Sequence, residues 1–106
     1  MQQLSPQQLV DHINHSASKP VLIDVREPHE LAICAIDGVL NIPLNQLPGA
    51  LNELDPDQEY ALICHHGMRS QRGCEFLYAN GFTKLINLVG GMEAWACDID
   101  PEMARY

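Results

Sequence analysis

The residues from Cys64 to Ser70, CHHGMRS, crowd several chemically active side chains into one short turn. They supply a thiol, two imidazoles, a glycine and a guanidinium, and they follow the apolar run YALI at Tyr60 to Ile63. Such a set could bind a metal ion, transfer a phosphoryl group or carry a sulfur atom. The spacing of the residues helps to decide among the three.

A metal site is the weakest of these interpretations. Cys64, His65 and His66 are consecutive, so their side chains cannot converge easily on one tetrahedral ion, and no Cys-x2-Cys pair accompanies them. His12 and His15 lie three residues apart on a predicted helix and could share a face. Ordinary surface histidines explain that pair better, so we expect no bound metal.

Cys64 is better explained as a nucleophile, which requires the thiolate form. A loop between a strand and the following helix directs backbone N–H groups inward, and the helix start adds partial positive charge. Gly67 allows backbone conformations closed to other residues, and Arg69 adds a permanent cation whose fork suits a tetrahedral oxyanion. A cysteine that merely fills space after a buried strand would not explain Cys, Gly and Arg together at this spacing.

The elements that must position this turn alternate between strand and helix patterns. The expected strands are residues 21–25, 38–44, 59–64 and 83–91. The expected helices start with a capping box at SPQQ (5–8) and then cover 27–32, 47–54 and 69–81, with MEAW (92–95) opening a last one. This alternation predicts an α/β fold with a parallel sheet and helices on both faces. Ligands bind outside the carboxyl ends of strands in such folds, and Cys64 lies at one such end.

Length and composition indicate one compact domain over residues 1–106. The chain is 46% hydrophobic, so it can bury a core without disulfides or a structural metal. Its formal net charge of −8 disfavours nucleic acid and anionic membrane surfaces as partners. The start MQQLSPQQLV has neither the basic flank nor the apolar core of a signal peptide. We therefore expect a cytoplasmic, monomeric protein whose four cysteines remain thiols.

Four segments of the chain carry a family resemblance in the right order. They are VLIDVREPHEL (21–31), IDGVLNIPL (36–44), CHHGMRS (64–70) and NGFTKLINLVGGMEAW (80–95). They resemble the Asp-Val-Arg-Glu turn, the Gly-x-x-Asn-Ile-Pro segment, the active loop Cys-x-x-Gly-x-Arg-Ser and the closing Gly-Gly and Ala-Trp pattern of the rhodanese family of sulfurtransferases. One departure is Cys34-Ala35-Ile36, where the family commonly has Gly-His-Ile. We expect altered packing there rather than lost chemistry.

The resemblance implies a rhodanese-like α/β fold, with a five-stranded parallel sheet flanked by helices on both faces. It also implies sulfur transfer in two steps without a cofactor. Cys64 would take the outer sulfur of thiosulfate or a similar small sulfur-containing anion, forming a persulfide. Cyanide or a thiol, including that of a thioredoxin-like protein, would then accept this sulfur.

The resemblance also implies roles for the residues around Cys64. The loop N–H groups from His65 to Arg69, that of Gly67 among them, would hold the sulfur and the donor's oxyanion, and Arg69 would add charge and shape. The side chains of His65, His66 and Met68 would line the mouth of the site, while Ser70 would support the loop.

Charged residues after the first predicted strand are interpreted as support for the active loop. Asp24, Arg26 and Glu27 follow a buried run, and buried charges are normally paired. An ion pair or hydrogen-bonded turn therefore explains them better than direct catalysis.

The other cysteines, Trp95 and the Gly90-Gly91 pair receive structural interpretations. Cys74 stands beside Gly73 and is assigned to packing, while Cys34 and Cys97 are taken as incidental. Trp95 is interpreted as a core anchor, and the two glycines as a tight turn near the site.

Cysteine-based phosphatases are the sharpest alternative, because their loops also combine a cysteine, backbone N–H groups and an arginine. Those loops have one more residue than the four that separate Cys64 from Arg69. A shorter ring makes a smaller bowl, which suits one sulfur atom better than a phosphoryl group. Arsenate reduction is weaker still, because no paired cysteine lies nearby. A non-enzymatic persulfide carrier or interaction module would keep the same loop, so that alternative stays open.

Overall fold

A five-stranded parallel sheet in the order β1-β5-β4-β2-β3 organises the computed structural model, which describes residues 1–106. The strands are β1 (Gln2–Leu4), β2 (Val21–Asp24), β3 (Leu40–Asn41), β4 (Tyr60–Ile63) and β5 (Leu85–Leu88). The α-helices are α1 (Pro6–His15), α2 (Pro28–Leu31), α3 (Leu47–Ala50), α4 (Met68–Ala79) and α5 (Gly91–Asp98). Short 3-10 turns, η1 (Leu44–Gln46) and η2 (Leu51–Glu53), flank α3.

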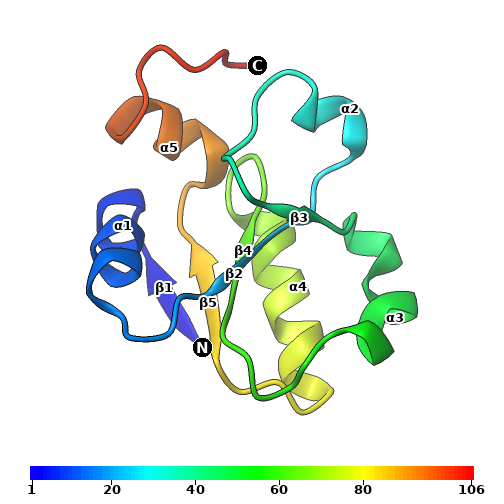
Figure 1. Ribbon diagram of the computed structural model, residues 1–106. Helices are drawn as coiled ribbons and strands as arrows, with labels where there is room; N and C mark the ends of the chain where they lie inside the picture. The colour runs from blue at the N-terminus through cyan, green and yellow to red at the C-terminus, as the bar shows by residue number, and fades with distance from the viewer.

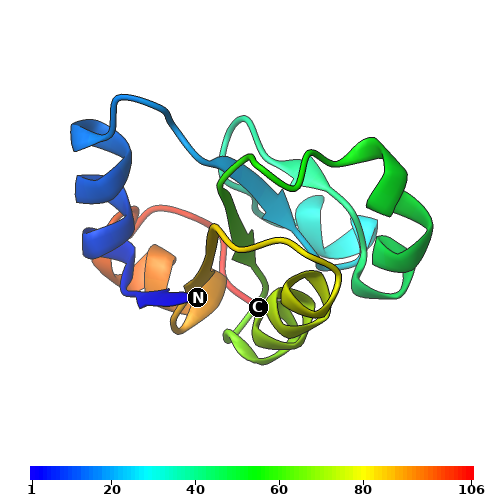
Figure 2. The ribbon, with the colours of Figure 1, turned by 90° about the horizontal axis from the view of Figure 1, so that it is seen from below.

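Helices cover both faces of the sheet, as expected. Figure 1 shows α1 and α5 on one side and α3 and α4 on the other, and Figure 2 gives the same layers from below. The central strand β4 serves both layers because neighbouring side chains point to opposite faces. Leu62 packs in the cluster with residues of α3 and α4, whereas Ala61 and Ile63 pack with residues of α1 and α5.

The ends of two helices follow their sequence signals. Ser5 Oγ accepts from the Gln8 amide at 3.2 Å, and Gln8 Oε1 accepts from the Ser5 amide at 2.9 Å, so the predicted capping box is present. At the end of α4, Gly81 has φ of 93°, and the Phe82 amide donates to the Leu77 carbonyl at 3.1 Å.

Three strands differ from the sequence prediction. The strand expected over 83–91 covers only Leu85–Leu88, because Gly90 and Gly91, with φ of 78° and 57°, turn the chain into α5. The strand expected over 38–44 pairs with β2 only at Leu40 and Asn41, because Gly38 turns the chain with φ of 84° and Pro43 begins the next turn. The short β1 was not expected, since Gln2 and Gln3 are polar. It pairs with the already buried β5 and so needs no apolar pattern of its own.

The chain contains no helix that is both long enough and apolar enough to cross a membrane.

Replacing Ser5 by alanine removes the side chain that accepts from the Gln8 amide. We expect the free energy of unfolding to fall by about 1 kcal/mol in urea denaturation. The control is Gln7→Ala, at an exposed position on the first turn of α1. This substitution should change the free energy of unfolding by less than about 0.5 kcal/mol. Equal effects of the two substitutions would contradict a contribution from the cap.

Candidate active site

Cys64 stands directly after β4, where the loop of residues 64–70 (the active loop) leads into α4. Only 1% of the surface of Cys64 is exposed to solvent. Gly67 has φ of 99°, and a Cβ there would lie 3.1 Å from the Gly90 amide nitrogen. The positive φ and the close approach of Gly90 both require glycine at position 67. Because β4 is buried and ends at Ile63, the predicted placement of Cys64 at the carboxyl end of a buried strand is confirmed.

The first turn of α5 holds two carbonyl groups of the active loop. The Met92 amide donates to the Cys64 carbonyl at 2.8 Å, and the Glu93 amide donates to the His65 carbonyl at 3.0 Å. Gly91, with φ of 57°, lets α5 approach this closely, because a Cβ at that position would overlap the Cys64 carbonyl oxygen. The expected turn at Gly90-Gly91 thus contacts the site directly.

The Cys64 sulfur accepts a hydrogen bond from the Gly67 amide at 3.0 Å. The amides of His65, His66, Met68 and Arg69 have no acceptor within the protein. Unpaired N–H groups at the start of a helix favour negative charge, so they are available to an anion that approaches the sulfur. The sulfur of Cys64 therefore lies next to backbone N–H donors that suit an anion.

Ser70 connects the sulfur to β5. Its buried Oγ lies 3.3 Å from the Cys64 sulfur and 2.5 Å from Asn87 Oδ1. Asn87 in turn donates to Gln3 Oε1 at 2.9 Å. A serine hydroxyl has one proton, so Ser70 can donate to Asn87 beside a neutral thiol and rotate toward a thiolate. Sequence reasoning missed Asn87, although a lone amide in the apolar run LINL was a signal.

Arg69 binds a carboxylate rather than presenting a free fork. Its two terminal amino groups donate to Glu30 at 2.7 Å and 2.8 Å. The hydrogen bonds from Arg69 hold the pKa of Glu30 well below its ordinary value of 4.5, although burial opposes this shift. Arg69 therefore lies beside the loop with its planar fork occupied, a pairing that sequence analysis did not foresee.

The charged turn after β2 contains a buried ion pair, as predicted. Arg26 is fully buried and binds the Asp24 carboxylate through Nε and Nη2, the latter at 2.8 Å. Burial opposes its charge, but the hydrogen bonds to Asp24 and Tyr106 raise the pKa of Arg26 above its ordinary value. Glu27 is exposed and forms no ion pair, but its amide donates to Glu30 Oε1 at 3.1 Å, so it belongs to the expected hydrogen-bonded turn. Glu30, which was not predicted, pairs with Arg69.

The departure at Cys34-Ala35-Ile36 is accommodated through the backbone. The Cys34 carbonyl accepts from Arg26 Nη2 at 2.8 Å, a contact that does not depend on the side chain. Cys34 and Ile36 pack at the edge of the cluster under α1 and α5.

His65 lies in a stack of three rings. The centroid of the His65 ring lies 4.0 Å from that of the His66 ring and 3.8 Å from that of the Tyr106 ring. The planes of the His65 and Tyr106 rings differ by 11°. Burial lowers the pKa of His65 below its ordinary value of 6.5, which favours the neutral ring. The expected mouth residues His66 and Met68 are exposed, Met68 at 71%. Tyr106 was not foreseen, because the sequence does not indicate that the end of the chain returns here.

The residues considered for other chemistry have ordinary partners. His12 Nε2 lies 2.8 Å from Glu59, and His15 Nδ1 lies 2.7 Å from the Asp11 carbonyl, so the two rings do not converge. The structure brings no three metal-ligating side chains together. Cys74 is fully buried, and burial raises its pKa to about 12, which agrees with a packing role.

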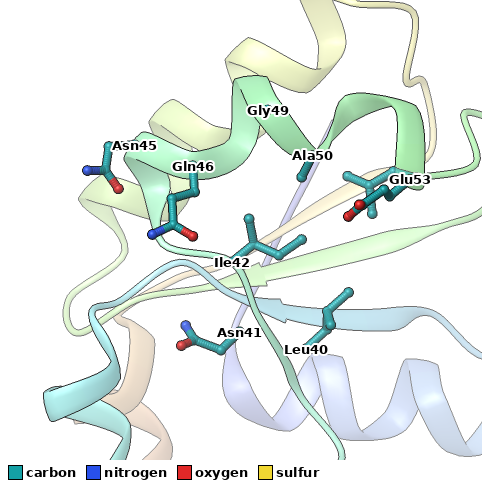
Figure 3. Close-up of a pocket in the computed structure, with 9 residues that line it drawn as sticks. Leu40, Asn41, Ile42, Asn45, Gln46, Gly49, Ala50 and Glu53 are labelled. Carbon is teal, nitrogen blue, oxygen red and sulfur yellow. The ribbon is translucent and has the colours of Figure 1, made fainter.

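The largest surface hollow, of about 660 Å³, lies between β3 and α3 rather than at Cys64. Figure 3 shows Ile42 on the strand side of this hollow, with Gly49 and Ala50 on the helix opposite. No residue of the active loop lines any of the three hollows of the molecule. The thiol is therefore closed to large molecules in this structure.

Known proteins similar to this chain identify its class. A sulfurtransferase of Allochromatium vinosum is 34% identical over 76 residues, which are 72% of this chain and 71% of that protein. YtwF of Bacillus subtilis is 42% identical over 81 residues, which are 76% of this chain and 78% of that protein. These similarities and the fold support a general assignment to the sulfurtransferases.

The family follows from the whole domain. A rhodanese-like domain protein of Staphylococcus aureus has a TM-score of 0.81 and 32% identity, covering 90% of this chain and 91% of its own. Residues 5–98 match the rhodanese-like domain. The chain belongs to the rhodanese family, and the expected fold is confirmed.

Glu30→Gln should remove stability that depends on pH. The pKa of Glu30 is lower in the folded protein than in the unfolded chain. Its contribution to stability is therefore complete above the unfolded pKa and is lost progressively as the pH falls from there toward the folded pKa. We expect the wild-type protein to exceed the variant in free energy of unfolding above about pH 5, and the difference to shrink below about pH 4. Glu27→Gln, at an exposed position beside α2, is the control in urea denaturation. An equal difference at neutral and acid pH would contradict the ionised pair with Arg69.

Gly91→Ala should displace α5 from the active loop, because the new Cβ overlaps the Cys64 carbonyl and φ is positive. We expect a loss of about 2–4 kcal/mol in free energy of unfolding. Gly49→Ala is the matched control, since a Cβ on α3 meets nothing within 4 Å. If the two variants were equally stable, the close contact of α5 with the loop would be wrong.

Proposed function

We propose that this protein moves a sulfane sulfur from thiosulfate, or a similar small anion, to a thiophilic acceptor through a persulfide on Cys64. In the first step the Cys64 thiolate attacks the outer sulfur of the donor. A new S–S bond forms at Cys64, the S–S bond of thiosulfate breaks, and its electron pair leaves with sulfite.

In the second step an acceptor attacks the terminal sulfur of the persulfide. Cyanide would form thiocyanate, and the electron pair of the broken S–S bond would return to Cys64 as the thiolate. A thiolate acceptor would leave with the sulfur as its own persulfide. The transfer needs no cofactor, because each step exchanges one bond to sulfur for another.

The observation that carries this proposal is the contact of the Gly67 amide with the Cys64 sulfur at 3.0 Å. It supports a role for the loop amides in holding a charged sulfur, since hydrogen bonds to the charged form favour that form. The loop amides with no acceptor in the protein, which exclude that of Gly67, suit the donor's oxyanion, with His66 and Met68 at the mouth.

Ser70 and the charged residues Asp24, Arg26 and Glu30 support the loop in this proposal. Ser70 contacts the sulfur directly, at 3.3 Å. The buried pair of Asp24 and Arg26 fixes the turn that precedes Glu30, and Glu30 fixes Arg69. Arg69 thereby adds positive charge near the sulfur without binding the donor through its fork.

Phosphoryl transfer is less well supported by the same geometry. An arginine that binds a phosphoryl group needs its fork free for two oxygens, and here both terminal amino groups are bound to Glu30.

Incubation with thiosulfate followed by intact-mass measurement without reductant tests the persulfide. We expect the protein to gain one sulfur atom and to lose it on addition of cyanide, because Cys64 is the nucleophile. Cys64→Ser should gain none. Cys97→Ser, which changes an exposed cysteine outside the loop, should behave as wild type. No gain with thiosulfate or another sulfane donor would contradict the proposal.

Multiple turnovers of thiosulfate and cyanide by catalytic amounts of protein would separate an enzyme from a carrier that is loaded once. An aryl phosphate assay addresses the phosphatase alternative, and Cys64-dependent hydrolysis would favour that alternative over sulfur transfer.

A further inference from the structure

The C-terminal segment, residues 99–106, leaves α5 and returns to the active loop. In Figure 1 the end of the chain lies between α5 and α2. Backbone hydrogen bonds hold the first part of the segment, with the Asp100 amide 3.1 Å from the Trp95 carbonyl and the Met103 amide 3.0 Å from the Asp100 carbonyl. Beyond Met103 no backbone group bonds to another backbone group. Side chains therefore hold the last residues.

Tyr106 contacts three residues of the site. Its ring stacks on His65 at 3.8 Å, and its hydroxyl donates to Glu30 Oε2 at 2.8 Å. The same hydroxyl accepts from Arg26 Nη1 at 2.9 Å. Two of these partners are charged, which makes the hydrogen bonds stronger than neutral ones. One side chain thus ties the end of the chain to α2, to the turn after β2 and to the active loop.

Arg105 also fastens the segment, through an ion pair with the first turn of α5. Its guanidinium pairs with Glu93, whose amide holds the His65 carbonyl. Arg69 Nη2 and the Tyr106 hydroxyl both donate to Glu30 Oε2, each at 2.8 Å. The phenol of Tyr106 consequently lies beside the guanidinium of Arg69, a residue of the active loop.

The Cys64 thiol needs a route to solvent, because it is 1% exposed and no hollow reaches it. The rest of its surroundings is fixed: α5 clamps the loop carbonyls, and Ser70 and Gly67 are buried. The last residues differ, since Tyr106 is 39% exposed and forms no hydrogen bond to another backbone group. A segment with few buried contacts opens at low free-energy cost.

We propose that Tyr106 is a specificity-determining residue that narrows the route to Cys64. Stacked on His65, it admits small acceptors such as cyanide and excludes bulky ones. A bulky thiol, such as that of a protein acceptor, reaches the sulfur only when Tyr106 has left. The part that concerns acceptors rests on the proposed sulfur transfer, whereas the narrowing of the route does not.

Alkylation of the reduced protein tests the route without any sulfur donor. The probes are iodoacetamide, which is small, and a maleimide that carries a polyethylene glycol chain. Peptide mass analysis gives the rate at each of the four cysteines separately. The variants are Tyr106→Ala, Tyr106→Phe and the control Tyr78→Ala, which changes an exposed tyrosine at the far end of α4.

Tyr106→Ala should raise the rate of Cys64 with the bulky probe by roughly tenfold, because charge-assisted hydrogen bonds that close the route are lost. The rate with iodoacetamide should rise much less. Tyr106→Phe keeps the stacked ring and should fall between wild type and alanine. Tyr78→Ala should match wild type. An unchanged ratio of the two rates in Tyr106→Ala would overturn the proposal.

Cys74 reports whether a variant has simply loosened the fold, because it is fully buried in the core. It should stay unlabelled in every variant. Labelling of Cys74 in step with Cys64 would mean general unfolding and would also overturn the proposal.

Steady-state kinetics then extend the test to acceptors. Tyr106→Ala should raise kcat/KM for a thioredoxin-like protein thiol relative to cyanide, and an unchanged ratio would overturn the part on acceptors. If wild type forms no persulfide but the alkylation ratio shifts, the sulfur chemistry fails and the narrowed route stands. If wild type forms a persulfide but the alkylation ratio is unchanged, the sulfur chemistry stands and the narrowed route fails.

Discussion

The clamp of α5 on the active loop is the constraint on which the site depends. The amides of Met92 and Glu93 hold the carbonyls of Cys64 and His65, and this is possible only because Gly91 has no side chain. The carbonyls of Cys64 and His65 are thus engaged with α5. The loop amides have no backbone acceptor, and that of Gly67 donates to the sulfur of Cys64. The geometry of the thiol is thus set by a helix that follows it by more than twenty residues in the sequence.

A chain of alternating charges runs beside that loop. Asp24 binds Arg26, Tyr106 bridges Arg26 to Glu30, and Glu30 binds Arg69. Each buried charge has an opposite partner, which offsets the cost of removing it from water. In a protein with a net charge of −8, this arrangement places two of the six basic residues at the carboxyl ends of the strands. It joins α2, the active loop and the end of the chain into one polar layer.

Sequence reasoning reached those features that short-range patterns encode. The capping box at Ser5, the buried strand YALI and the glycine that ends α4 each depend on neighbouring residues, and all three are present. Contacts between distant residues were not predicted. Nothing near Arg69 indicates that Glu30 occupies its fork, and nothing near His65 indicates Tyr106. The strand β1 was missed for a similar reason, since its place is provided by β5.

The pairing of β1 with β5 bears on how the domain is made. Gln2 lies beside Ile86, so the residues of β1 meet their sheet neighbours only after the chain has been synthesised through β5. α1 also packs against α5, which comes later still. Parallel pairing over such sequence separations carries a large loop-closure entropy and slows folding. The sheet and the α1 layer are therefore completed only after β5 and α5 have been translated, and β1 has no strand partner until then.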